Sequence, residues 1–261
     1  MRVLTWNLLT ETSVDAPPWS VRGPVVAARV ADLAPVVLGV QEGSRAMLDD
    51  LASRLPDRYR WVGEGRGGTG HDEHGAVVYD ASALTLLDLR HRWLSPTPEV
   101  PGSIASDADL PRMLTAARFH HGASGATFTV VSTHLDHLGA QARVDGAAQV
   151  ATEAAHGPTV VMGDFNDPAE DSEAYRILTG SGLVDALAPR DRAERRLRTF
   201  TGFDPDSEGE GEQIDWMLVT PDVTVSDAWV VAGPTDEASP SDHRAVVADL
   251  VVGPQAARNQ R

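Results

Sequence analysis

The stretch Thr159-Val160-Val161-Met162-Gly163-Asp164-Phe165-Asn166 decides how the rest of the sequence is interpreted. Its first four residues are apolar or β-branched, as in a strand that is buried on both faces. Gly163, Asp164 and Asn166 then end the strand, because glycine, aspartate and asparagine favour turns. A buried strand therefore carries polar side chains at its carboxyl end, although this segment alone also fits an ordinary turn.

Three other apolar runs end in the same way. The polar residues that follow them are Asn7 after residues 3–6, Gln41 and Glu42 after residues 36–40, and His134 after residues 127–133. Two later segments, Ile214-Asp215-Trp216 and Ser241-Asp242-His243, add further acid, base and ligand types. Each segment alone also fits a helix cap, a turn or a half-buried histidine. Together, at one rim of a sheet structure, they predict a single anionic pocket that contains histidine.

Short apolar runs of the length and composition of strands recur along the whole chain. They cover residues 3–6, 36–40, 76–79, 83–89, 113–119, 127–133, 159–162, 214–219, 223–231 and 245–252. Apolar residues at helical spacing predict helices within residues 25–33, 47–55, 138–155 and 172–179. Strands outnumber helices, which favours an α/β fold of two packed sheets with helices outside.

The chain is predicted to form one domain over residues 1–252, followed by a polar tail over residues 253–261. The glycine-rich stretch at residues 63–70 is interpreted as a loop tip, because the apolar pattern resumes directly after it. No repeat of domain-building length is evident.

Composition limits the chemistry. The 261 residues include no cysteine and no lysine, which excludes thiolate metal sites, cysteine nucleophiles, Schiff bases and the lysine of a phosphate-binding P-loop. The 22 basic and 38 acidic residues give a net charge of -16, which disfavours tight, salt-sensitive binding of nucleic acid. A local arginine patch or a bound dication can still hold one phosphate.

No run of residues is long and apolar enough to span a membrane, and no apolar leader follows Met1. We therefore expect a cytoplasmic chain without a membrane partner, and a monomer by default.

The six segments resemble the endonuclease/exonuclease/phosphatase superfamily, the deoxyribonuclease-I-like metallohydrolases. The resemblance is carried, in the family order, by Trp6-Asn7, Gln41-Glu42, Thr133-His134-Leu135-Asp136-His137, Gly163-Asp164-Phe165-Asn166, Ile214-Asp215-Trp216 and Ser241-Asp242-His243. It implies a four-layer sandwich, in which two mixed sheets pack face to face and helices cover both outer sides.

The residues of the histidine motif are similar to those in a branch of small bacterial metal-dependent hydrolases. The segments Leu110-Pro111-Arg112 and Glu73-His74-Gly75, each before a strand, also resemble that branch. The abasic-site repair enzymes of the superfamily carry a tyrosine where this chain has His134. This departure favours general phosphoesterase chemistry over base-excision repair.

The resemblance also implies roles for individual residues. Asn7, Glu42 and Asp242 would hold Mg²⁺ or Mn²⁺, because these ions prefer oxygen ligands. His243 would be the general base with Asp215 as its partner, and Asp164 would orient the attacking water.

Three further side chains are expected to contact the substrate phosphate. Asn166 would hydrogen-bond a phosphate oxygen, His134 would donate to the phosphoryl group, and Arg112 offers a charged planar fork, unless it forms a plain surface ion pair. Asp136 and His137 are expected to orient His134.

The predicted function is hydrolysis of a phosphomonoester or phosphodiester by activated water, on a small phosphorylated substrate. The first alternative is a DNA or RNA nuclease, which a groove lined by Arg66, Arg90, Arg92 and Arg112 with stacking aromatic residues would favour. A non-catalytic binding module is the second, but every expected acid, base and ligand is present.

Overall fold

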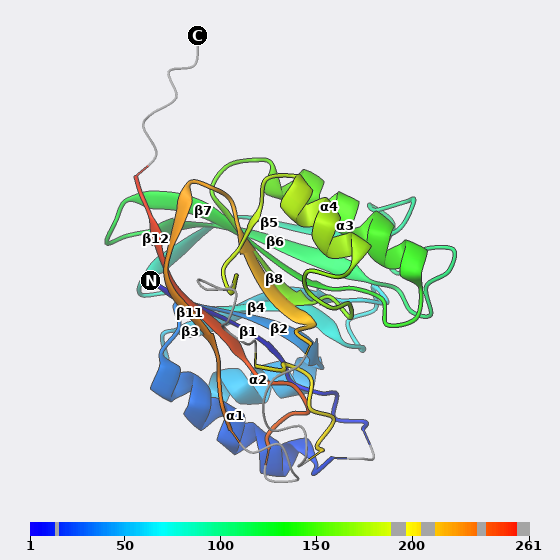
Figure 1. Cartoon of the computed structure of the whole chain (residues 1–261). Helices are drawn as coiled ribbons and strands as arrows, with labels where there is room; N and C mark the ends of the chain where they lie inside the picture. The colour runs from blue at the N-terminus through cyan, green and yellow to red at the C-terminus, as the bar shows by residue number, and fades with distance from the viewer. Residues whose placement is uncertain (14–15, 189–196, 205–211, 234–238, 255–261) are drawn as a thin grey trace.

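The computed structural model describes residues 1–13, 16–188, 197–204, 212–233 and 239–254, and has the predicted α/β four-layer sandwich (Figure 1). In the described part of the chain, two mixed six-stranded sheets pack face to face between two pairs of helices. The predicted fold class is therefore confirmed.

The first sheet has the strand order β11-β12-β1-β2-β4-β3. Its strands are β1 (Arg2–Asn7), β2 (Val37–Gly43), β3 (Tyr59–Gly65), β4 (His74–Asp80), β11 (Val223–Val230) and β12 (Val246–Val252). β1 and β2 are parallel, with Asn7 opposite Gln41, and the other neighbours in this sheet are antiparallel.

The second sheet has the order β5-β6-β7-β8-β10-β9. Its strands are β5 (Leu84–Trp93), β6 (Met113–His121), β7 (Ala126–His134), β8 (Thr159–Asp164), β9 (Val184–Asp185) and β10 (Asp215–Val219). β7 and β8 are parallel, with His134 opposite Asp164, and the other neighbours are antiparallel.

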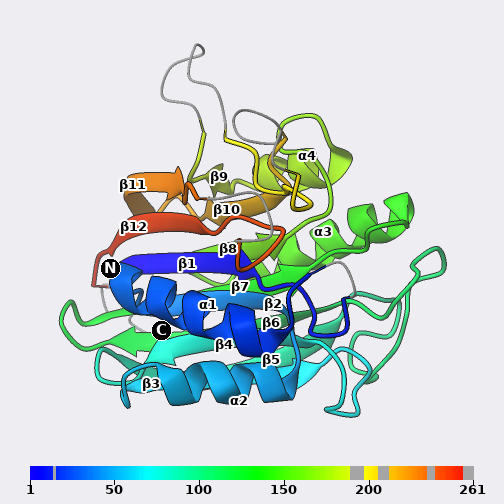
Figure 2. The ribbon, with the colours of Figure 1, turned by 90° about the horizontal axis from the view of Figure 1, so that it is seen from below.

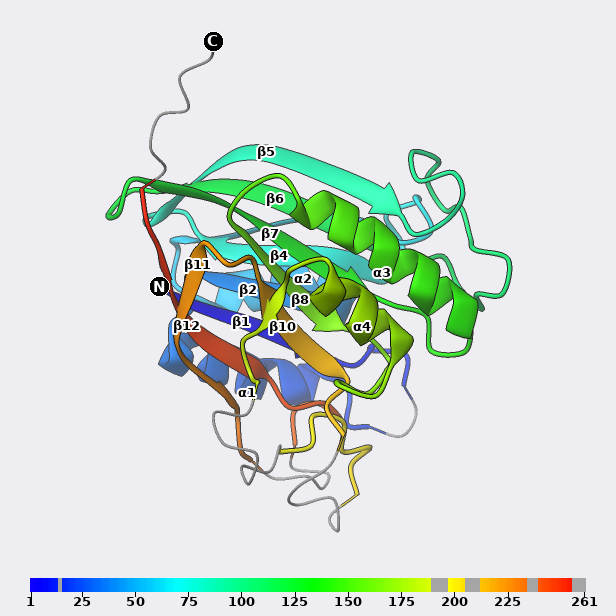
Figure 3. The same ribbon diagram turned by 45° about the horizontal axis from the view of Figure 1, so that its top comes forward.

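Two helices cover the outer face of each sheet. Figure 2 shows α1 (Trp19–Leu33) and α2 (Arg45–Arg54) over the first sheet, and Figure 3 shows α3 (Ala140–Ala154) and α4 (Glu173–Gly180) over the second. α1 connects the parallel strands β1 and β2, and α3 connects β7 and β8. Each parallel pair needs such a crossover, because a tight turn joins only antiparallel strands.

Three apolar clusters among the described residues fill the spaces between the four layers. Val3, Val160 and Met162 lie between the two sheets, whereas Leu4 packs under α1 and α2 and Val161 under α3 and α4. Both faces of the central strands are thus buried, which explains why these strands are continuous apolar runs rather than alternating ones.

The sequence prediction missed the edge strand β3, whose second half lies in the stretch interpreted as a loop tip. β3 contains Tyr59, Trp61 and two glycines among polar residues, and its pairing with β4 is what makes it a strand. The predicted helix at residues 25–33 also begins earlier, directly after Pro18. Most of the predicted tail, residues 255–261, lies outside the described residues, and the domain boundary at residue 252 stays a prediction.

Across the described ranges, the structure contains no helix that is long and apolar enough to cross a membrane.

We expect Gly163→Ala to destabilise the fold strongly. Gly163 has φ 156°, and a Cβ atom there would lie 1.9 Å from the carbonyl oxygen of Thr133 on the neighbouring strand. Because that atom is backbone in a buried parallel pair, we expect a loss of about 3 kcal/mol or more in the free energy of unfolding, measured by chemical denaturation.

Gly180→Ala at the end of α4 is the control, since a Cβ atom there meets nothing within 4 Å. It should change stability by no more than about 1 kcal/mol. Equal stability of Gly163→Ala and the wild type would contradict the close approach of β7 and β8.

Candidate active site

The carboxyl ends of the two parallel strand pairs meet at one edge of the sandwich. Asn7 is the last residue of β1, and its side-chain amide lies 2.9 Å from Glu42 Oε1 and 3.0 Å from Asp164 Oδ2. Its Oδ1 accepts the backbone N–H of Leu9. The Asn7 side chain is completely buried and joins the first sheet to the second.

Glu42 is held in an unusual backbone conformation. Its φ of 62° lies in the left-handed region, at an irregularity in the pairing of β2 with β4. Such a conformation is rare for residues other than glycine and often marks a functional position. The Glu42 Oε2 atom also accepts the backbone N–H of Thr10, so the carboxylate is fixed at the edge of the sheet.

His243 and Asp215 form a buried pair. His243 Nδ1 lies 2.9 Å from Asp215 Oδ2, while His243 Nε2 lies 3.7 Å from Asp164 Oδ2. Asp215 is opposite Asp164 in the pairing of β10 with β8, which sets the two carboxylates side by side. The Asp215 Oδ1 atom is buried and has no hydrogen-bond partner among the described residues.

The loop that carries Ser241 and His243 is tied to the first sheet by hydrogen bonds to backbone carbonyls. The Trp6 indole donates to the carbonyl of His243, and the Ser241 hydroxyl donates to the carbonyl of Asn7. Arg22 of α1, also buried, donates to the carbonyls of Leu8 and Pro240. Sequence reasoning did not find this role of Arg22, and no motif marks it.

Burial and the neighbouring carboxylates shift the pKa values of the ionisable groups in the site. Burial lowers the pKa of His243, but the charges of Asp215 and Asp164 outweigh it and raise that pKa to about 10. Burial raises the pKa of Asp164 to about 7. Burial also raises the pKa of Asp242, where the negative charge of Glu42 adds to the effect. The site therefore holds more negative charge than its own cations neutralise.

This excess of negative charge, together with hard oxygen donors, fits a divalent cation. Glu42 and Asp242 supply carboxylates, and Asn7 supplies an amide that already contacts Glu42. In the described part of the chain, Asp164, Asp215 and His243 also offer ligand atoms within 4.8 Å of one another. The sequence prediction named Asn7, Glu42 and Asp242 as ligands, and their assignment stays a prediction.

His134 lies next to Asn166 at the end of β7. The Asn166 amide lies 3.0 Å from His134 Nε2 and donates to the carbonyl of Leu135, also over 3.0 Å. His134 Nε2 also lies 3.5 Å from Asp164 Oδ2, and burial lowers the pKa of His134 well below its ordinary value. The expected donation of His134 to the phosphoryl group stays a prediction.

Arg112 is buried rather than part of a surface ion pair. Its Nε lies 3.4 Å from Asp136 Oδ2 and its Nη2 lies 3.0 Å from His137 Nδ1, whereas its Nη1 has no partner among the described residues. Asp136 also accepts backbone N–H groups of residues 109, 138 and 139. Asp136 and His137 therefore orient Arg112 instead of the expected His134.

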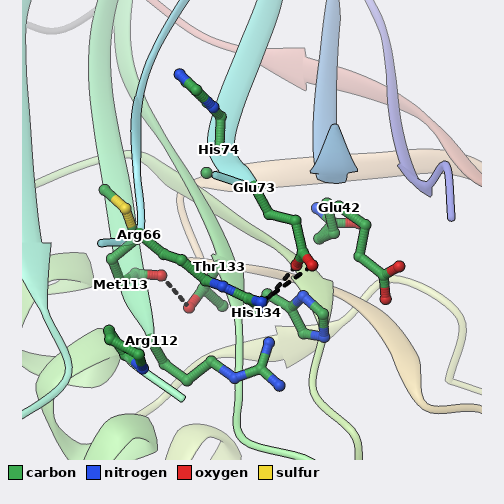
Figure 4. Close-up of a pocket in the computed structure, with 11 residues that line it drawn as sticks. Glu42, Arg66, Glu73, His74, Arg112, Met113, Thr133 and His134 are labelled. Carbon is green, nitrogen blue, oxygen red and sulfur yellow. Dashed lines mark hydrogen bonds and ion pairs between the residues drawn. The ribbon is translucent and has the colours of Figure 1, made fainter. Parts of the chain in front are cut away.

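A pocket of about 290 Å³, partly open to solvent, extends from Glu42 and His134 between the β3–β4 hairpin and β6 (Figure 4). Arg112, Arg66 and Glu73 line it, with Met113 and Pro111 among the apolar groups. The sequence analysis placed Glu73 only before a strand, and the pairing of β3 with β4 brings it to this pocket.

The four arginines of the nuclease hypothesis do not gather in one groove. Arg66 and Arg112 line the pocket, but Arg90 and Arg92 form ion pairs with Glu153 of α3. They are thus bound to a helix on the outer face of the second sheet.

A sequence profile of the Endonuclease/Exonuclease/phosphatase family matches residues 4–243. The chain belongs to this family. Members of the endonuclease/exonuclease/phosphatase family are metal-dependent hydrolases of phosphoesters, and the anionic, histidine-containing edge described above agrees with that chemistry.

Solved structures of the family superpose over nearly the whole chain. The mannosyl-6-phosphatase of Bacteroides thetaiotaomicron is 31% identical, with a TM-score of 0.85, and covers 96% of this chain and 99% of its own. A family protein of Bacteroides vulgatus is 30% identical, with a TM-score of 0.85 and coverage of 96% and 98%.

The catalytic domain of human Nocturnin with bound sulfate is 19% identical, with a TM-score of 0.71 and coverage of 96% and 94%, and shares the fold. No curated protein sequence matches this chain significantly.

We expect Asp215→Asn to lower the pKa of His243 in the metal-free protein. The Asp215 charge raises that pKa, so its removal should lower the pKa by about one unit or more. The measurement is a pH titration of the histidine ring signals by NMR in the presence of a chelator.

Asp249→Asn is the matched control, because Asp249 pairs with Arg2 and not with the site. It should leave the His243 titration unchanged. An identical His243 pKa in Asp215→Asn and wild type would show that the two side chains are not paired in solution.

Proposed function

We propose that this chain is a Mg²⁺- or Mn²⁺-dependent phosphoesterase that hydrolyses a phosphomonoester or phosphodiester of a small molecule with water as the nucleophile. The observation that carries the proposal is the buried His243–Asp215 pair, with Asp164 beside it and the Asn7 and Glu42 side chains at the same edge.

His243 is suited to take a proton from water at Nε2. Its other ring nitrogen is bonded to Asp215, which fixes the tautomer and stabilises the imidazolium that forms. In the metal-free protein the carboxylates raise its pKa to about 10, so the imidazole would keep its proton at neutral pH. A dication held nearby by Asn7, Glu42 and Asp242 would lower this pKa, because its positive charge disfavours a protonated imidazole, and would so free His243 to act as a base.

Asp164 would orient the attacking water. Its Oδ2 lies 3.0 Å from the Asn7 amide and 3.7 Å from His243 Nε2, so a water bonded to Asp164 lies within reach of the base. Asp164 Oδ1 accepts the backbone N–H of Asn166, which fixes the carboxylate.

Asn7, Glu42 and Asp242 are the residues that we propose hold the cation. When bound, a dication would neutralise negative charge on the phosphoryl oxygens. A second group could also offer ligands, namely Asp164, Asp215 and His243. In that group, however, His243 and Asp215 are already hydrogen-bonded to each other.

Arg112 and Asn166 would bind the phosphoryl oxygens. Arg112 Nη1 has no partner among the described residues and belongs to a pocket-lining guanidinium, which suits an anionic oxygen. One N–H of the Asn166 amide can exchange its contact with His134 for a phosphate oxygen, while the bond to the carbonyl of Leu135 keeps Asn166 in place.

A small substrate fits the pocket better than a polymer. The pocket is narrow, because residues of β2, the β3–β4 hairpin, β6 and β7 line it and part of its 290 Å³ is open solvent. The similar protein of Bacteroides thetaiotaomicron is named a mannosyl-6-phosphatase, and a sugar monophosphate has a suitable size. The nuclease alternative loses support because Arg90 and Arg92 pair with Glu153.

Two substitutions should separate metal binding from proton removal, assayed on a panel of phosphate esters with Mg²⁺ or Mn²⁺. Glu42→Gln should raise the metal concentration for half-maximal activity at least about tenfold, because one ligand charge is lost. His243→Ala should lower kcat at least about 10²-fold at every metal concentration.

A chelator should abolish activity of the wild type. Full turnover by the metal-free protein would refute the metal assignment. If folded His243→Ala kept more than a tenth of the wild-type kcat, another base would have to be assigned.

Long duplex DNA should be a poor substrate. The net charge of -16 repels a polyanion over most of the surface, whereas a short ligand meets that repulsion only locally. We expect kcat/KM to be higher on small phosphate esters than on plasmid or oligonucleotide at matched salt. Binding of DNA to His243→Ala should also be weak. Efficient cleavage confined to the polymers would reverse this ranking.

A further inference from the structure

Arg66 and Glu73 form an ion pair on the wall of the pocket. Arg66 Nη1 lies 2.6 Å from Glu73 Oε2, and Arg66 Nη2 lies 3.0 Å from Glu73 Oε1. Figure 4 shows both side chains reaching into the pocket, with their charged ends close to His134. The side chains are 18% and 19% exposed, so the pair is neither sealed in the core nor free in solvent.

The backbone holds this pair in a fixed position. The Arg66 N–H donates to the carbonyl of Glu73 across the hairpin, and the Trp93 indole donates to the carbonyl of Arg66. Asp72 accepts the N–H of Gly67 and closes the tip of the hairpin. A Cβ atom at Gly67 would lie 2.1 Å from Asp72 Oδ2, so a side chain at this position would displace the Asp72 carboxylate. A site fixed in this way loses little entropy when a ligand binds.

The pair retains unused hydrogen-bonding capacity. A carboxylate has about four acceptor positions and a guanidinium has five N–H donors, of which the bidentate contact uses two on each side. A hydroxyl group can donate to Glu73 and a neighbouring hydroxyl oxygen can accept from Arg66. Met113 and Pro111 offer apolar surface in the same pocket for the C–H face of a ring.

A second phosphate does not suit this position. Glu73 already neutralises Arg66, and a carboxylate repels an anionic group that approaches it. The guanidinium left for a phosphate is that of Arg112, on the other side of His134 (Figure 4). The pocket therefore has a neutral polar wall beyond the position proposed for the phosphoryl group.

We propose that Arg66 and Glu73 bind neighbouring hydroxyl groups of the leaving group, so that the enzyme selects phosphate esters of polyhydroxylated molecules. This inference rests on the proposed phosphoesterase function. It adds a subsite for the leaving group to the residues that act on the phosphate, and it assigns the selectivity to a pair that lies outside the six motifs.

The test compares two esters with the same number of carbons. Glucose 6-phosphate and mannose 6-phosphate carry hydroxyl groups, whereas n-hexyl phosphate lacks them. We expect wild type to have at least about tenfold higher kcat/KM on a hexose phosphate than on hexyl phosphate, because the alkyl chain would cover the remaining donors and acceptors of the pair without replacing their hydrogen bonds to water. Glu73→Gln should lower this ratio at least about tenfold.

Glu64→Gln is the matched control, because Glu64 lies on the same hairpin but does not line the pocket. It should leave the ratio unchanged. Thermal unfolding of each variant shows whether it is folded, and if Glu73→Gln is unfolded, Arg66→Gln is used in its place. An equal preference in the wild type and in the folded Glu73 or Arg66 variant would overturn the proposal.

If the proposed phosphoesterase function is wrong, the experiment gives a different result. In that case no ester is hydrolysed with Mg²⁺ or Mn²⁺, and calorimetric binding of the two kinds of ester becomes the readout. Tighter binding of hexose phosphate than of hexyl phosphate to wild type, reduced in Glu73→Gln, would support the hydroxyl-binding pair. Equal binding of both esters to wild type would overturn it.

Discussion

The hydrogen bond between the Asn7 amide and the Asp164 carboxylate is the contact on which the site depends, because it joins the two sheets at the edge where their parallel strands end. Both side chains are buried, and a buried polar group without a partner is costly. The same Asn7 nitrogen contacts Glu42, so the candidate metal ligand and the candidate water-orienting carboxylate keep a fixed relation. A shift of one sheet against the other would break the Asn7–Asp164 bond, whereas Asn7 and Glu42 both belong to the first sheet and would move together.

Close packing behind this edge maintains that relation. Gly163 allows β7 and β8 to approach so closely that no side chain fits at that position. Arg22 donates to the carbonyls of Leu8 and Pro240, which lie in the loops after β1 and before His243. The indole of Trp6 holds the backbone of His243 in the same way. The base is therefore placed by contacts to main-chain atoms, which differ from the contacts that place the candidate metal ligands. A substitution of Glu42, whose carboxylate contacts Asn7 and Thr10, can consequently test metal binding without removing these supports of the base.

The apolar runs were enough to predict two packed sheets with helices outside, since strand length and composition are local features of the sequence. The resemblance of the six segments to the family implied the four layers and the roles of Asn7, Glu42, Asp164 and His243. What could not be predicted depends on pairing across long separations. β3 is polar and glycine-rich, and only its pairing with β4 makes it a strand. Asp136 was expected to orient His134 because the two are neighbours in sequence, but its carboxylate lies against Arg112, 24 residues away.

The two sides of the site have opposite electrostatic character. Asp164, Asp215 and Asp242 leave an excess of negative charge at the edge of the sheets, whereas Arg112 adds a buried cation at the pocket, and the Arg66–Glu73 pair is neutral. The carboxylates at the edge of the sheets would repel an anion alone, and the pocket with Arg112 would offer no partner to a cation alone. A phosphate ester bound together with a dication satisfies both, because the ion neutralises the carboxylates and Arg112 neutralises the phosphate. The overall charge of the chain thus disfavours polyanions more than a single phosphate, because the favourable contacts are short-range and the repulsion is spread over the surface.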